Sequence, residues 1–180
     1  MYKQIIDFWF KELEPKQWWI KDFEFDQMIQ SRFGDLHNQA KAGELFHWRE
    51  TALGSLAEVI VLDQFSRNIY RDTPESFACD AMALALSQFA VSKGLDSELP
   101  QTQRVFLYMP FMHSESKLIH IEAVKLFESL GPEGKGNLDF EYKHKAIIDR
   151  FGRYPHRNQI LGRESTEEEI EFLKQPNSGF

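Results

Sequence analysis

Apolar residues recur at helical spacing along almost the whole chain. In one segment Phe25, Ile29, Phe33, Leu36 and Ala40 lie three or four residues apart, which places them on one side of a helix. The strict alternation of apolar and polar residues that marks a half-buried strand is nearly absent. The pattern therefore predicts an all-α protein of about eight or nine helices.

The expected helix ends carry residues with defined capping chemistry. Asp22 is predicted to cap a helix N-terminus, because its carboxylate accepts hydrogen bonds from the first free N–H groups. Gly152 is predicted to end a helix over 139–151, since glycine adopts the left-handed conformation at low cost. The spacing of Ser165 and Glu168 predicts a capping box at the last helix. Short loops between the helices favour antiparallel packing of neighbours.

Length and composition favour one domain over residues 1–180. No linker or low-complexity segment divides the chain, and its 16 Phe, 4 Trp and 5 Tyr supply ample core material. Cys79 is the single cysteine, which excludes an intramolecular disulfide and a cysteine-based zinc site. The first ten residues lack the pattern of a signal peptide, and no apolar stretch approaches the roughly 20 residues that span a bilayer. We therefore expect a cytoplasmic protein without membrane contact.

The net charge of −7 disfavours non-specific binding to nucleic acid, but the charge is unevenly distributed. Residues 143–163 contain six basic residues and one acidic residue. Five glutamates follow within 164–171. The basic segment is therefore expected either to meet an anionic partner or to be neutralised by these glutamates.

Ionisable residues fall on the apolar faces of three predicted helices, where burial is costly unless the charge is paired or used. Asp63 continues the apolar stripe of its helix and lies four residues before Arg67, a spacing that permits an ion pair. Glu115 and Glu122 share an apolar face on a later helix, and His144 points inward from the helix that follows it. These faces are expected to build a polar site.

Two arginine-dense segments, 67–71 and 150–158, lie at predicted helix ends. The second leads into a helix N-terminus at Pro155, where free N–H groups favour an anion and arginine can bind carboxylate or phosphate with two hydrogen bonds. We therefore predict a site for a small anionic molecule or an acidic peptide terminus. The residues predicted to bind it are Asp63, Arg67, Asn68, His113, Glu115, His144, Arg150, Arg153, His156, Arg157 and Asn158.

Two alternatives explain the same residues. In the first, the arginines pair with Asp63, Glu115 and Glu122 and tie together the helices of a scaffold. In the second, a small hydrolase or transferase uses His144 or His113 as acid and base beside Glu115. Both alternatives stay open at this point. No metal site or cofactor is predicted, because no local ligand motif such as H-E-x-x-H is present.

Five motifs resemble those of a bacterial family called domain of unknown function 924. They are IDFWF at 6–10, LDQFSRNIYR at 62–71, LYMPFMHSE at 107–115, RFGRYPHRN at 150–158 and LGREST at 161–166. Ser66 and Tyr154 stand where the family pattern has Pro and Phe, and neither change alters the charges. The resemblance covers nearly the full length. It implies a tetratricopeptide-like array of helical hairpins, a fold whose concave face is commonly a binding surface, and it implies no activity.

Overall fold

The computed structural model describes residues 1–176, 178 and 179, and every regular element in this part of the chain is a helix. When each continuous helix is counted once, the described residues form eight helices, which confirms the all-α prediction. The arrangement is compatible with a tetratricopeptide-like array. The chain divides into two compact units, with unit 1 comprising residues 1–71 and 75–110, and unit 2 comprising residues 72–74 and 111–180.

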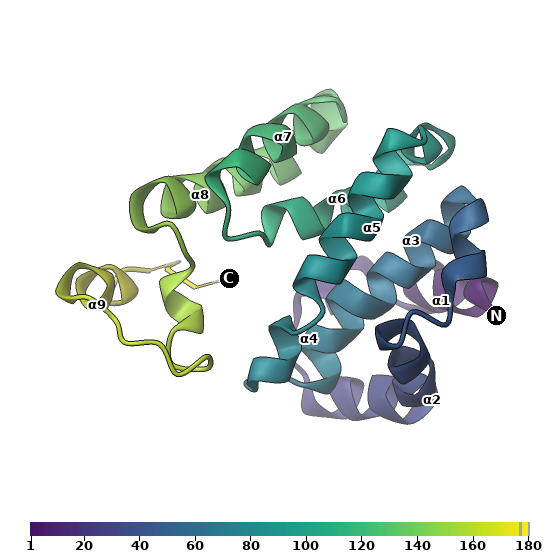
Figure 1. Cartoon of the computed structure of the whole chain (residues 1–180), viewed down its shortest axis with the longest axis horizontal. Coiled ribbons are helices and arrows are strands. Elements are labelled where there is room, and N and C mark those ends of the chain that lie inside the picture. The colour runs from purple at the N-terminus through teal and green to yellow at the C-terminus, as the bar shows by residue number, and fades with distance from the viewer. Residues whose placement is uncertain (177, 180) are drawn as a thin grey trace. The chain divides into compact units, whose positions relative to one another are not determined.

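The first part of the chain supplies the helices of unit 1 (Figure 1). In order they are α1 (Tyr2–Asp7), the π-helical turn η1 (Phe8–Glu12), the 3-10 turn η2 (Pro15–Trp19), α2 (Phe23–Lys41), the 3-10 turn η3 (Phe46–Glu50), α3 (Ala52–Ile60), the π-helical turn η4 (Val61–Phe65), α4 (Ser66–Ile69), the 3-10 turn η5 (Pro74–Phe77), α5 (Asp80–Ser92), the 3-10 turn η6 (Leu95–Glu98) and α6 (Gln101–Met112). Two of these elements, η5 and α6, cross the boundary between the units.

The centre of unit 1 is the continuous helix formed by α3, η4 and α4. Every residue from 54 to 66 is buried, and α3 packs against both α1 and α5. Gly54 is required there, because a Cβ at this position would lie 2.1 Å from the backbone oxygen of Trp48. Phe65 joins the helix to the aromatic core of the unit, with its ring centroid 5.2 Å from that of Phe33 and 5.6 Å from that of Trp9.

Unit 2 is built around an antiparallel hairpin of α7 (Lys117–Glu128) and α8 (Lys135–Phe151), which lie side by side (Figure 1). The 3-10 turn η7 (Pro132–Gly134) connects them, and the 3-10 turn η8 (Pro155–Arg157) and α9 (Glu167–Leu173) follow. Gly152 ends α8 with a φ of 70°, as its sequence position predicts. The structure thus supports the expected hairpin packing of neighbouring helices in this unit.

One predicted N-cap is present, and the predicted capping box is shifted by one residue. Asp22 caps α2 as predicted, because its Oδ1 accepts a hydrogen bond of 2.9 Å from the Phe25 amide. The predicted capping box lies one residue later than expected, at Thr166 and Glu169. The shift has a physical cause, since Glu169 also accepts hydrogen bonds from Arg153 and Asn158.

The buried face of α7 differs from the prediction, whereas that of α8 agrees with it at His144. We expected Glu122 on the inward face of α7, yet it is exposed and pairs with Lys125, while His120 is fully buried. On α8, Glu141 is buried as well, about one turn before His144. The mutual pairing of His120 and Glu141 stabilises this register, although a carboxylate alone at the same place would be unfavourable.

None of the described helices combines the length and the apolarity that crossing a membrane needs.

Candidate functional site

Arg67 in α4 is held between two carboxylates of unit 1. Its Nη1 lies 3.1 Å from Oδ1 of Asp63, which confirms the predicted pair, and 2.9 Å from Oδ1 of Asp80. Its Nη2 donates to Oδ2 of Asp80 over 3.1 Å. Asp63 itself lies in the π-helical turn η4 and also accepts from Nε2 of Gln64 over 2.6 Å. Because Asp80 belongs to a separate helix, no sequence spacing marked it as a partner.

Asn68 belongs to a second ionic group within unit 1. Its Nδ2 donates to Oδ1 of Asp26 over 2.8 Å, and Arg71 donates to both oxygens of the same carboxylate over 2.5 and 2.7 Å. These bonds join α2 to α4 and the turn after it. Predicted site residues of unit 1 therefore take part in ion pairs that connect its own helices.

Glu115 accepts hydrogen bonds from the segment on either side of Pro155. Oε1 of Glu115 accepts from the Tyr154 amide over 2.7 Å and from Nη2 of Arg163 over 2.9 Å, and Oε2 accepts from Nη1 of Arg163 over 2.6 Å. Burial raises the pKa of Glu115, but the hydrogen bonds from Arg163 and Tyr154 outweigh it and leave that pKa below its usual value. Arg163 was counted in the basic segment but was not among the predicted site residues.

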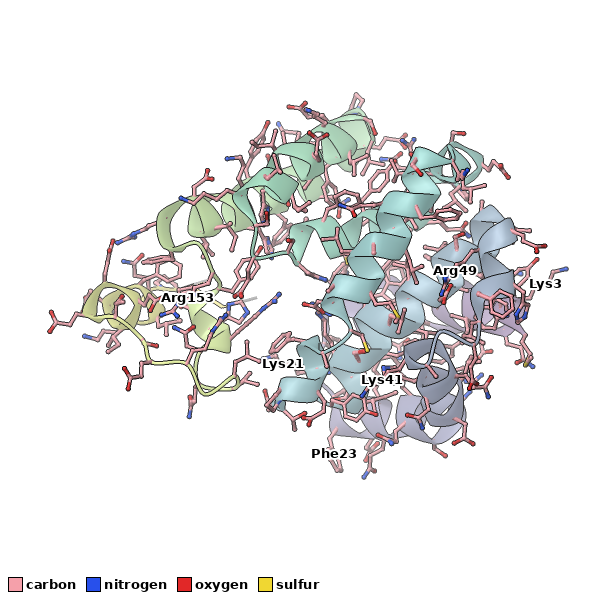
Figure 2. All side chains as sticks on the ribbon, in the orientation of Figure 1. Lys3, Lys21, Phe23, Lys41, Arg49 and Arg153 are labelled. Atoms are coloured by element: carbon pink, nitrogen blue, oxygen red, sulfur yellow. The ribbon has the colours of Figure 1, made fainter. Side chains whose placement is uncertain are left out.

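Arg153 (Figure 2) forms a second internal pair of the same kind with Glu169, between the turn after α8 and the start of α9. Arg153 donates to Oε1 of Glu169 over 2.6 Å and to Oε2 over 2.7 Å, and Asn158 donates to Oε2 over 3.2 Å. The Arg153 hydrogen bonds are the largest of the effects that lower the pKa of Glu169 to about 2. Arg150, by contrast, pairs with Glu168 in an exposed contact of 2.8 Å.

Tyr154 is the centre of the remaining predicted residues in unit 2. Its ring centroid lies 5.7 Å from that of His144, 5.5 Å from that of His156 and 6.4 Å from that of His120. The guanidinium carbon of Arg157 lies 4.7 Å from the same centroid, a cation–π geometry. Tyr154 is itself buried, and its hydroxyl donates to the Met112 carbonyl over 2.5 Å.

His113 completes this group, which we call the Tyr154 cluster: His113, His120, His144, Tyr154, His156 and Arg157. Nη2 of Arg157 donates to the backbone oxygen of His113 over 3.0 Å. Burial is the largest of the effects that lower the pKa of His144 to about 3, and repulsion by His113, His120 and His156 when they are protonated adds to it, against a bond to the Phe140 carbonyl that raises it. His144 is therefore neutral at physiological pH and donates from Nδ1 to that carbonyl over 2.8 Å.

The predicted site residues thus fall into defined groups within each unit. Asp63, Arg67 and Asn68 belong to the ionic groups of unit 1, whereas the other eight lie in unit 2. Sequence reasoning missed Tyr154 and Arg163, although both lie in motifs that had been singled out. Among the described residues, no three His, Cys, Asp or Glu side chains come together as a metal ion would need.

Comparisons with known proteins agree with this architecture. The model of a family described as bacterial protein of unknown function (DUF924) matches residues 5–177. A solved structure of a protein of unknown function from Agrobacterium tumefaciens is similar over 96% of each chain, with 40% sequence identity and a TM-score of 0.90. Comparison with curated proteins found no match.

Proposed function

This chain belongs to the DUF924 family of bacterial proteins, and we propose that it binds a small ligand carrying a carboxylate or phosphate group at the Tyr154 cluster of unit 2. The observation that carries the proposal is that Arg157 and His156 both lie against the Tyr154 ring, with Arg157 also bound to the backbone of His113. An imidazole becomes a cation when it is protonated. An anion bound there would offset the repulsion of protonated His113 and His156 by Arg157.

The two halves of the cluster suit different roles in binding. Arg157 is buried and supplies a permanent positive charge, because a guanidinium stays protonated at any physiological pH. His113 and His156 are half-buried, so a ligand can reach them more readily. In the proposed complex, Arg157 provides the fixed attraction and the two half-buried histidines donate hydrogen bonds to the oxygens of the anion.

The lowered pKa values of His144 and Glu115 favour binding over the acid–base chemistry considered for these two residues. A general acid or base works best when its pKa lies near the operating pH. The pKa of His144 is about 3, and that of Glu115 is lowered by its bonds to Arg163 and Tyr154. Neither group is therefore suited to exchange protons at neutral pH.

The scaffold alternative has its own support, and it applies to different residues. Arg153 and Arg163 are each bound to both oxygens of a carboxylate of the chain, so in this structure they act as links between segments. The binding proposal accordingly rests on the Tyr154 cluster and gives Arg150, Arg153 and Arg163 no direct contact with the ligand.

Isothermal titration and thermal unfolding with inorganic phosphate, acetate and a short peptide with a free C-terminus test the proposal. A binding anion raises the melting temperature in proportion to the logarithm of its concentration. His156→Asn should weaken that response, and so should His113→Asn, whereas His47→Asn should not, because His47 is an exposed histidine of η3 in unit 1. Sodium chloride at matched ionic strength controls for general screening.

The outcomes separate the alternatives. Binding that depends on His113 and His156 and grows as the pH falls supports the proposal, because protonated imidazoles attract the anion. Equal responses in the His156→Asn and His47→Asn variants would show that the anion binds elsewhere. No response to any of the three probes beyond that of sodium chloride would favour the scaffold.

A further inference from the structure

His120 of α7 and Glu141 of α8 form a fully buried pair in the α7–α8 hairpin. Both side chains have no exposed area, and Nδ1 of His120 lies 2.7 Å from Oε1 of Glu141. Nε2 of the same imidazole lies 2.9 Å from the backbone oxygen of Ser114 and 3.3 Å from the hydroxyl of Tyr154. The pair is separate from the two half-buried histidines that the proposed ligand would contact.

The partners of the imidazole fix one of its two protons. A backbone carbonyl oxygen can only accept, so Nε2 of His120 carries a hydrogen and donates it to Ser114. The Tyr154 hydroxyl already donates to the Met112 carbonyl, so it does not compete for that role. A second proton lies between Nδ1 of His120 and Oε1 of Glu141, and it can reside either on the imidazole or on the carboxyl group.

The other oxygen of Glu141 decides between these two states. Among the described residues, Oε2 of Glu141 has no hydrogen-bond partner, although it is buried. A carboxylate with one oxygen left unsatisfied in the interior is costly, whereas the carbonyl oxygen of a neutral acid loses much less. We infer that Glu141 is a neutral carboxylic acid in the folded protein and donates its proton to Nδ1 of a neutral His120.

The charged neighbours are few and are consistent with this assignment. Lys145, one turn after Glu141 on α8, is bound to Asp149 over 2.5 Å. His144 on α8 and Tyr154 after α8 also face the pair, and His113 and His156 lie near His144. Burial is the largest effect on the pKa of Glu141 and raises it, against the opposing effects of His120 and Lys145.

This assignment makes the hairpin a proton-linked element. The folded state keeps a proton on Glu141 that the unfolded chain releases above pH about 4.5, the ordinary glutamate range. An unfolded histidine also holds a proton below pH about 6.5, so the pair takes up a net proton on folding only above that pH, and there its contribution to stability falls as the pH rises. A neutral His120 also adds no charge to the Tyr154 cluster. The inference does not depend on the proposed function.

Glu141→Gln provides the test, because glutamine can donate the same hydrogen bond but cannot ionise. We expect the urea midpoint of the variant to rise relative to the wild type as the pH is raised from 4 to about 7.5. An ion pair of Glu141 and His120 would hold the same single proton, so this trend shows that the folded pair keeps a proton and does not locate it. No trend, or the opposite one, would overturn the inference. Glu122→Gln on α7 is the matched control, because Glu122 is exposed.

Nuclear magnetic resonance of the wild-type protein locates the shared proton, because it distinguishes the neutral pair from an ion pair. The imidazole nitrogen shifts of His120 should report a neutral ring protonated on Nε2, with Nδ1 as an acceptor. Shifts of an imidazolium with both nitrogens protonated would overturn the inference. This measurement stands even if Glu141→Gln fails to fold.

Discussion

Arg163 and Glu115 lie 48 residues apart in the chain, yet they form a bidentate pair with donor–acceptor distances of 2.6 and 2.9 Å. The Tyr154 amide donates to the same carboxylate, so one glutamate joins three segments of unit 2. The arrangement is that of an anion site whose anion belongs to the protein. Its occupant can be removed by mutation, which makes the site testable.

Glu115→Ala should destabilise unit 2 by about 2–3 kcal/mol, because it removes charge-assisted hydrogen bonds and leaves Arg163 without its carboxylate. Urea unfolding measures the loss. Acetate should restore part of it in the variant and have little effect on the wild type, because the added carboxylate can take the place of the missing side chain. Equal acetate effects in the two proteins would contradict this prediction.

Glu169→Gln should destabilise α9 by about 2 kcal/mol, because Glu169 accepts hydrogen bonds from Arg153, Asn158 and the Thr166 amide. The folded pKa of Glu169 is about 2, below its unfolded value, so its contribution is complete above pH about 4.5 and is lost as the pH falls towards 2. Urea midpoints of variant and wild type should converge over that range.

The neighbouring pair of Arg150 and Glu168 serves as the control for this experiment. Its two side chains are 47% and 62% exposed, so Glu168→Gln should change stability by less than about 0.5 kcal/mol. A loss as large as that of Glu169→Gln would mean that burial does not distinguish the two pairs.

His144 should make the protein less stable in acid. Its folded pKa of about 3 lies below the ordinary value of 6.5, so the unfolded chain binds the proton first as the pH falls. Between pH 6.5 and 4.5 this linkage should remove about 2–3 kcal/mol of stability. His144→Asn, which can still donate to the Phe140 carbonyl, should show a shallower fall in urea midpoint over the same range. Parallel pH profiles would exclude the assigned role of His144.

Two glycines of the α8 region should respond to alanine in opposite directions. Gly152 has a φ of 70°, so Gly152→Ala should cost about 1 kcal/mol in backbone strain. Gly136 lies within α8 with open space around it, so Gly136→Ala should stabilise the protein by up to about 1 kcal/mol through helix propensity. Thermal unfolding of the two variants measures both effects, and changes of the same sign would contradict this account.

Local chemistry made several features predictable from the sequence. The Asp22 cap, the Gly152 helix end and the Asp63–Arg67 pair depend on residues at most four positions apart, and all three are present. The helical class follows from periodicity, which extends over nearly the whole chain.

Partners that come from separate helices could not be predicted in the same way. Asp80 for Arg67 and Arg163 for Glu115 are contacts that depend on packing, which one sequence does not encode as a spacing. The prediction that Glu122 faces inward was wrong, because a buried histidine and glutamate satisfy each other and place His120 on the buried face of α7.

The π-helical turn at Val61–Phe65 has a consequence for the length of the chain at this point. Each residue of an α-helix advances the next by about 100° around the axis. A π-helical turn holds one residue more than the α-helical turn it replaces, so deleting Leu62 would allow an ordinary α-helix and keep Arg67 and Asn68 in phase with Asp80 and Asp26. The turn is therefore a place where this helix can lose a residue and still keep both ionic groups of unit 1.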